Sequence, residues 1–166
     1  MMSEENPKRK PNRLIGFDYS QPGAYFVTIC AKEKRNLFSE IVGGGALDAP
    51  KIQLTQIGEI VNSHIQSTNC IPGIHVDKYV IMPNHIHLIL VIEPNGGPSR
   101  APAPTNALIP RAVAALKRFC NREIGENVFQ RSYHDHVIRD EADYLKIWNY
   151  IDTNPAKWEA DCFFTV

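Results

Sequence analysis

The stretch Met82-Pro83-Asn84-His85-Ile86-His87-Leu88-Ile89-Leu90 sets two histidines around one isoleucine at the start of an apolar run. Such a run, following a proline–asparagine turn, is typical of a β-strand. Because side chains alternate across a strand, His85 and His87 project from one face, and Ile86 and Leu88 from the other. Two neighbouring imidazoles on a rigid strand are half of a divalent-metal site. They are equally consistent with the solvent-exposed face of an ordinary strand, so the pair alone does not establish a metal site.

The segments around this stretch predict how it is placed in a sheet. Residues 74–81 form a second apolar, β-branched strand, and only Met82-Pro83-Asn84 separates it from the histidine strand, so the two should form an antiparallel hairpin. Residues 24–30 are aromatic and β-branched, which predicts another strand. A further strand is expected within residues 128–138, and residues 37–42 and 51–54 can form the arms of a separate hairpin.

Three helices are expected between and after these strands. Thr55 is a suitable N-cap for a helix that runs to about Thr68, and Pro110 suits the first turn of a second helix. Asp140 can cap a third helix that ends near Asn154, because the residue before Pro155 resists helical geometry. The order is βαββαβ followed by a C-terminal helix, once the small hairpin is set aside. This predicts an α+β fold with a ferredoxin-like antiparallel sheet and helices on one face.

Length and composition limit the classes of protein to consider. The 166 residues suit one domain, and we assign residues 1–12 to a flexible N-terminal arm and 13–166 to the domain. No apolar run approaches the roughly 20 residues of a membrane span, and the polar N-terminus is not a secretory signal. The four cysteines are scattered without metal or disulfide spacing, which is typical of reduced thiols in a cytoplasmic protein.

The charge of the chain is balanced overall but uneven along the sequence. Eighteen basic and 18 acidic residues give no net charge, which argues against indiscriminate binding to nucleic acid. Basic residues nevertheless gather in one segment, where they can contact phosphate groups or form a solvated helix face. This basic set is Arg111, Lys117, Arg118, Arg122 and Arg131.

A second polar constellation lies in the last predicted helix, within Asn149-Tyr150-Ile151-Asp152-Thr153-Asn154-Pro155. Tyr150 and Asn154 are four residues apart, so they are neighbours on the helix surface at the edge of its apolar stripe. Such a tyrosine can present its hydroxyl to a cleft, and Asn154 can orient a substrate or complete a metal site. The plainer alternative is a surface tyrosine and an asparagine that ends the helix before proline.

Four pieces of the sequence, in this order, carry a family resemblance. The chain resembles the single-tyrosine HUH transposases of the IS200 type, above all the branch of REP-associated tyrosine transposases. The resemblance spans residues 13 to 158, and all four pieces together make it specific. The pieces are Gly23-Ala24-Tyr25-Phe26-Val27-Thr28, Met82-Pro83-Asn84-His85-Ile86-His87, Gln130-Arg131-Ser132-Tyr133-His134-Asp135-His136-Val137-Ile138-Arg139 and Tyr150-Ile151-Asp152-Thr153-Asn154-Pro155.

The resemblance implies a role for each matching residue. His85 and His87 match the HUH histidines, which bind a divalent metal such as Mg²⁺ or Mn²⁺, and Tyr150 matches the nucleophile. Asn154 stands where the family has a polar side chain that helps to hold the metal. His136 matches a position near the active site with a supporting role. Tyr133 could be a rival nucleophile, although no family role falls on it.

The implied activity is cleavage and rejoining of single-stranded DNA that carries a hairpin. A metal on two imidazoles and an amide oxygen polarises a phosphodiester, and tyrosine attack leaves a covalent 5′-phosphotyrosine and a free 3′-hydroxyl. The basic set would hold the DNA backbone. Two alternatives remain, namely a non-catalytic hairpin-binding module and a phosphodiesterase that uses water. The family contains both monomers and homodimers, and the sequence does not choose between them.

Overall fold

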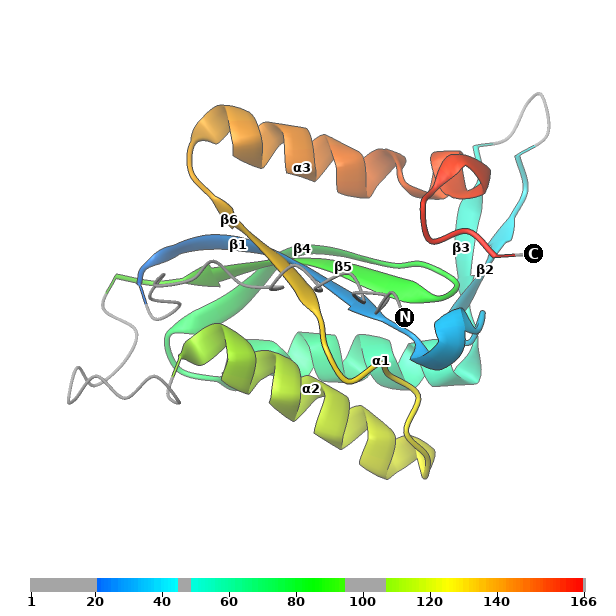
Figure 1. Ribbon diagram of the computed structural model, residues 1–166, viewed down its shortest axis with the longest axis horizontal. Coiled ribbons are helices and arrows are strands. Elements are labelled where there is room, and N and C mark those ends of the chain that lie inside the picture. The colour runs from blue at the N-terminus through cyan, green and yellow to red at the C-terminus, as the bar shows by residue number, and fades with distance from the viewer. Residues whose placement is uncertain (1–20, 45–48, 95–106, 166) are drawn as a thin grey trace, which may run out of the picture.

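A computed structural model describes residues 21–44, 49–94 and 107–165, which form a sheet between two layers of helix (Figure 1). The predicted N-terminal arm and most of the loop at 93–106 lie outside these residues. The elements, with three short 3₁₀ segments labelled η, are β1 (Gly23–Cys30), η1 (Lys32–Lys34), β2 (Ser39–Val42), β3 (Lys51–Leu54), α1 (Gln56–Ser67), η2 (Thr68–Cys70), β4 (Ile74–Ile81), β5 (His85–Ile92), α2 (Leu108–Ile124), β6 (His134–Ile138), α3 (Glu141–Thr153) and η3 (Pro155–Ala160).

The main sheet has the strand order β4-β5-β1-β6, and every neighbouring pair is antiparallel. β4 and β5 form the predicted hairpin, closed where Met82 N donates to His85 O at 2.8 Å. The next strand in space, β1, comes from the other end of the chain, with Thr28 opposite His87 and Cys30 opposite His85. This is the ferredoxin-like topology that the order of elements predicted.

α1 and α2 cover one face of this sheet and bury the larger core. Thr55 caps α1 as predicted, because its side chain accepts a hydrogen bond from Gly58 N at 3.0 Å. Gly58 is required by close approach: a Cβ atom there would lie 1.9 Å from the carbonyl oxygen of Phe38. The helix therefore starts pressed against the chain segment that leads into β2.

α3 lies on the opposite face of the sheet, above β4 and β5 (Figure 1). Asp140 caps it, accepting from Asp143 N at 2.8 Å, and Ile147 and Ile151 are buried against a smaller core on this face. Burial of each isoleucine contributes on the order of 2 kcal/mol. The two faces therefore differ, with paired helices on one and the single C-terminal helix on the other.

β4 holds α3 by polar contacts as well as by packing. Lys78 Nζ lies 2.6 Å from Asp152 Oδ1 and 4.0 Å from the centre of the Trp148 ring. The hydroxyl of Tyr144 donates a hydrogen bond to Asp77 at the irregularity between Val76 and Lys78 in the strand. These contacts fix the position of α3 relative to the sheet. Within the described residues, no helix is long and apolar enough to cross a membrane.

Candidate active site

Two buried histidines stand side by side on the sheet face that α3 covers. His85 and His87 are 0% and 1% exposed, and their ring centroids lie 4.5 Å apart. Strand alternation predicted that they share a face, and the structure confirms it. Their burial excludes the alternative of two polar residues on a wet strand face.

Each imidazole uses Nδ1 for a hydrogen bond within the protein. His85 Nδ1 lies 3.0 Å from Asn84 Oδ1, and His87 Nδ1 lies 2.9 Å from Thr28 Oγ1. The Asn84 amide is fixed, because its Nδ2 donates to the carbonyl of Phe163 at 2.7 Å. Asn84 Oδ1 therefore accepts, the proton of His85 sits on Nδ1, and the lone pair of Nε2 is left free. An imidazole whose Nδ1–H is held in this way is prepared to bind a metal through Nε2.

Several buried donor atoms of this site lack a partner within the described part of the chain. His85 Nε2, His87 Nε2 and Asn154 Oδ1 are buried, and none has a hydrogen-bond partner among the described residues. Unpaired buried polar atoms are costly, so three together need an explanation. Asp161 adds a carboxylate, and its oxygen and the two ring nitrogens all lie within 4.8 Å of one another. Two imidazoles with carboxylate and amide oxygens form a donor set that fits a divalent cation such as Mn²⁺ or Mg²⁺.

Burial keeps both histidines in the form that binds metal. It lowers the pKa of His85 to about 4, although Asp161 and Asn154 act in the opposite direction. Burial and then the charge of His85 hold the pKa of His87 well below its usual range. Both rings are therefore neutral near pH 7, and neutral imidazole is the form that serves as a metal ligand.

Tyr150 lies directly over this pocket. Its ring centroid is 5.2 Å from that of His87 and 6.1 Å from that of Phe26, which it meets edge to face. Its hydroxyl lies 3.5 Å from Asp161 Oδ2, and the side chain is 38% exposed. Burial and the charge of Asp161 raise the pKa of Tyr150 to about 12, so the hydroxyl is protonated at neutral pH. The site thus joins a candidate nucleophile to a candidate metal ligand.

Sequence reasoning missed Asp161, which reaches the pocket from the segment after α3. Its Oδ2 accepts from Asn154 Nδ2 at 2.8 Å, which leaves Asn154 Oδ1 free to face the histidines. Phe163 covers His85 with ring centroids 4.6 Å apart. Neither residue belongs to a periodic pattern, so their only signal was proximity in sequence to Asn154.

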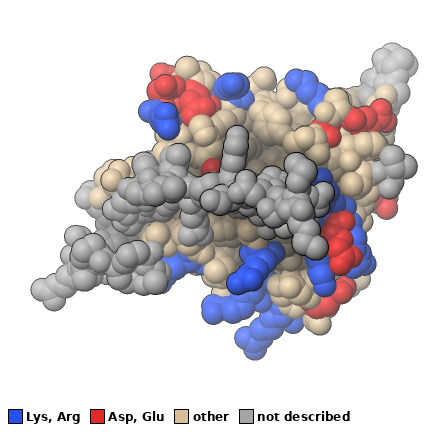
Figure 2. Space-filling model, viewed as in Figure 1, with Lys and Arg blue, Asp and Glu red and all other residues tan. Residues whose placement is uncertain are grey.

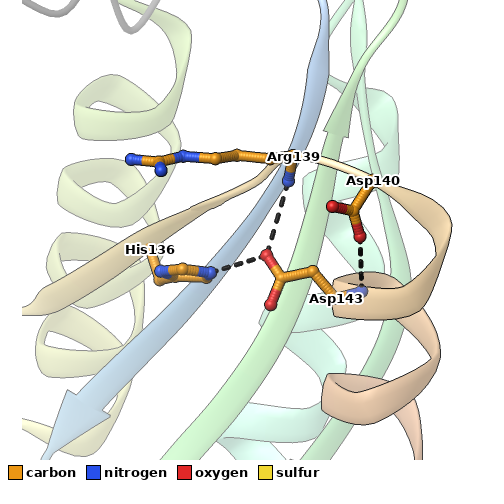
Figure 3. Close-up of polar contacts among 4 residues, drawn as sticks. All are labelled: His136, Arg139, Asp140 and Asp143. Atoms are coloured by element: carbon orange, nitrogen blue, oxygen red, sulfur yellow. Dashed lines mark hydrogen bonds and ion pairs between the residues drawn. The ribbon is translucent and has the colours of Figure 1, made fainter.

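The partner of His136 is Asp143 in the first turn of α3 (Figure 3). His136 Nε2 is 2.7 Å from Asp143 Oδ2, and the same oxygen accepts from Arg139 N at 3.4 Å. On the sheet, His136 is opposite Phe26, which contacts both His87 and Tyr150. His136 is therefore separated from the pocket by the Phe26 ring. The pair links β6 to the first turn of α3.

The four members of the basic set that lie on α2 are not at the pocket. Exposed Arg111, Arg118 and Arg122 lie on α2, which covers the sheet face opposite α3, and Figure 2 shows lysine and arginine side chains over that part of the molecule. Lys117 is engaged inside the protein: its Nζ donates to the carbonyls of Gln130 at 2.8 Å and Ser132 at 2.9 Å. Burial lowers its pKa to about 8. A role of the basic set in binding DNA stays a prediction.

Comparisons with known proteins give a sequence relative and a solved structure with a similar fold. No protein-family model matches the chain. An uncharacterised protein of Haemophilus influenzae is 34% identical over 171 residues, covering 92% of this chain and 91% of that protein. Among solved structures, a REP-associated tyrosine transposase bound to a REP hairpin superposes with a TM-score of 0.59 at 20% identity, over 94% of this chain and 74% of that one.

Proposed function

Because this chain belongs to one family with the Haemophilus influenzae protein and has the fold of a REP-associated tyrosine transposase, we propose that it cleaves and rejoins DNA strands. The proposed substrate is single-stranded DNA with a hairpin, since the solved transposase is bound to a REP hairpin, and the proposed nucleophile is Tyr150. One observation carries the proposal. The buried histidine pair, with unpaired Nε2 atoms, clusters with the Asp161 carboxylate beside the Tyr150 ring, and Asn154, whose Oδ1 is also unpaired among the described residues, bonds to Asp161.

The residues divide the chemistry between them. His85, His87, Asp161 and Asn154 would hold a divalent cation, which when bound polarises the phosphate and offsets its developing charge. Tyr150 Oη bonds to phosphorus, and its proton passes to the solvent to which the side chain is open. The bond from phosphorus to the 3′-oxygen breaks, and that oxygen takes a proton from solvent and leaves as a hydroxyl. The product is a 5′-phosphotyrosine, which a second 3′-hydroxyl can attack to rejoin the strand.

The whole constellation comes from one chain. The histidines are on β5, Asn154 and Tyr150 belong to α3 and its end, and Asp161 follows η3. A second copy is therefore not needed to complete the site, which favours a monomer as the active unit.

The first experiment is denaturing gel electrophoresis after incubation with Mn²⁺ and labelled single-stranded hairpin oligonucleotides. A DNA-linked protein band should form, and it should vanish with Tyr150→Phe and with chelator. Tyr79→Phe is the matched control, since its hydroxyl donates to Asn62 on the side of the sheet that α1 and α2 cover. Tyr133→Phe tests the rival nucleophile.

Other results of this experiment would favour a different function. Cleavage without a covalent band would indicate a phosphodiesterase that uses water, and tight binding with neither product would indicate a hairpin-binding module. Metal binding has a separate readout, because a cation that binds only the folded state raises its melting temperature. Mn²⁺ should stabilise the wild type, and Asp161→Ala should reduce that stabilisation.

A further inference from the structure

The turn after β1 has an unusual backbone beside the active site. Glu33 has φ of 58° and Lys34 has φ of 55°, and among the described residues these two alone combine a side chain with positive φ. Residues with a Cβ rarely adopt this left-handed conformation, and strained backbone concentrates at functional sites. Two such residues in succession indicate that the strain of this turn has a function, namely to position neighbouring groups.

The active-site segments hold this turn in place. The carbonyl oxygen of Lys34 accepts from Asn84 Nδ2 at 3.3 Å and from Thr165 Oγ1 at 3.2 Å. Asn84 is the residue that fixes the tautomer of His85, and Thr165 follows the segment that carries Asp161. The strained turn and the metal pocket therefore share their supports, so a shift in one would move the other.

The strained backbone directs a positive charge toward the edge of the pocket. Lys34 Nζ lies 6.0 Å from the centre of the Phe163 ring, and that ring packs on His85. Arg35 follows Lys34, Lys32 stands two residues before it with Glu33 between, and all four side chains are exposed. Within residues 21–44, 49–94 and 107–165 none of the three basic residues takes part in an ion pair, and the carboxylate in the pocket is that of Asp161.

We propose that Lys34 binds a DNA phosphate next to the one that is cleaved. This inference rests on the proposed function and adds a contact on the same face as Tyr150, unlike the basic residues of α2. A lysine acts on phosphate as a point charge and needs no fixed orientation, which suits a contact that must accept any sequence. Its place, one ring away from His85, puts it within reach of the strand that enters the pocket.

The expected effect follows from counterion release. Each phosphate that a lysine neutralises on a single strand contributes a slope of about −0.7 to the dependence of log affinity on log salt. Lys34→Ala should remove that contribution and weaken binding about eightfold at roughly 50 mM salt, but only about fourfold at roughly 150 mM. Lys34→Arg should keep both the affinity and the slope.

The experiment measures binding of hairpin oligonucleotides across a salt series, with Tyr150→Phe present in every protein so that no strand is cut. Lys51→Ala is the matched control, since it removes one exposed lysine from the small β2–β3 sheet. A second measurement replaces single phosphates around the cleavage position by uncharged methylphosphonates. A methylphosphonate at one phosphate next to the cleavage position should weaken binding to the protein that has Lys34. The same replacement should not weaken binding to the Lys34→Ala variant.

The outcomes separate the two proposals. If the protein with native Tyr150 forms the covalent product but Lys34→Ala leaves the salt slope and the methylphosphonate pattern unchanged, the Lys34 contact is wrong and the proposed function stands. If that protein neither forms the product nor binds hairpin DNA, both are wrong. Circular dichroism of the variant checks that it folds, so a lost slope in a folded protein supports the contact.

Discussion

Acid should destabilise this protein through the buried histidine pair, by an amount that follows from the pKa of His85. Burial lowers that pKa from 6.5 to about 4 in the folded state. Between these values the unfolded chain binds a proton that the folded protein does not, so stability falls as the pH falls. Linkage gives a loss of about 2 kcal/mol from His85 alone between about pH 7.5 and about pH 5. His87 is shifted in the same direction and adds to the loss.

Urea unfolding in the presence of chelator, at both pH values, measures this loss without bound metal. The variant His85→Gln removes the titrating group, so its loss should be smaller than that of the wild type by about 2 kcal/mol. His134→Gln is the matched control, because it replaces a histidine that is exposed on β6 and lies outside the buried pair. Equal losses in the wild type and in His85→Gln would refute the conclusion that the folded protein keeps His85 neutral.

Three further perturbations test the supports of the site. Thr28→Val removes the partner that orients the second histidine, so Mn²⁺ affinity, measured by calorimetry, should fall about 10-fold or more. Gly58→Ala forces a methyl group against the carbonyl of Phe38 and should lower the free energy of unfolding in urea by about 2–3 kcal/mol. The hydrogen bond with His136 lowers the pKa of Asp143 in the folded protein. The stability that this pair adds is therefore fully present above the pKa of the carboxyl group in the unfolded chain. It is lost as the pH falls through the pKa of Asp143 in the folded protein. His136→Gln should reduce that acid-dependent part of the unfolding free energy.

Local rules were sufficient to predict much of this molecule. Alternation across a strand placed His85 and His87 on one face, and capping chemistry placed the helix starts at Thr55 and Asp140. The short turn at 82–84 forced the β4–β5 hairpin, which in turn fixed the antiparallel pairing of the sheet. Each of these predictions depends on residues close together in sequence, where spacing alone determines geometry.

The residues whose places the sequence did not predict are positioned by tertiary contacts. Asp161 enters the pocket because Asn84 holds the carbonyl of Phe163, a contact between residues 79 positions apart in sequence. Lys117 was placed in the basic set by its charge, yet its length lets it reach carbonyl groups of the chain before β6. Charge and spacing do not reveal which partners a long side chain will find in the folded protein.

The position of Tyr150 relative to the histidines depends on the strand next to theirs. The histidines are on β5, while α3 is held by Lys78 of β4 through Asp152 and Trp148. A slip of α3 by one residue along this contact would rotate Tyr150 by about 100° and move it about 1.5 Å along the helix axis, off the His87 ring. Because β4 and β5 are hydrogen-bonded neighbours joined by a tight turn, the histidine pocket and Tyr150 share one rigid support. The β4–β5 hairpin therefore supplies the precise placement that in-line attack by Tyr150 would require under the proposed function.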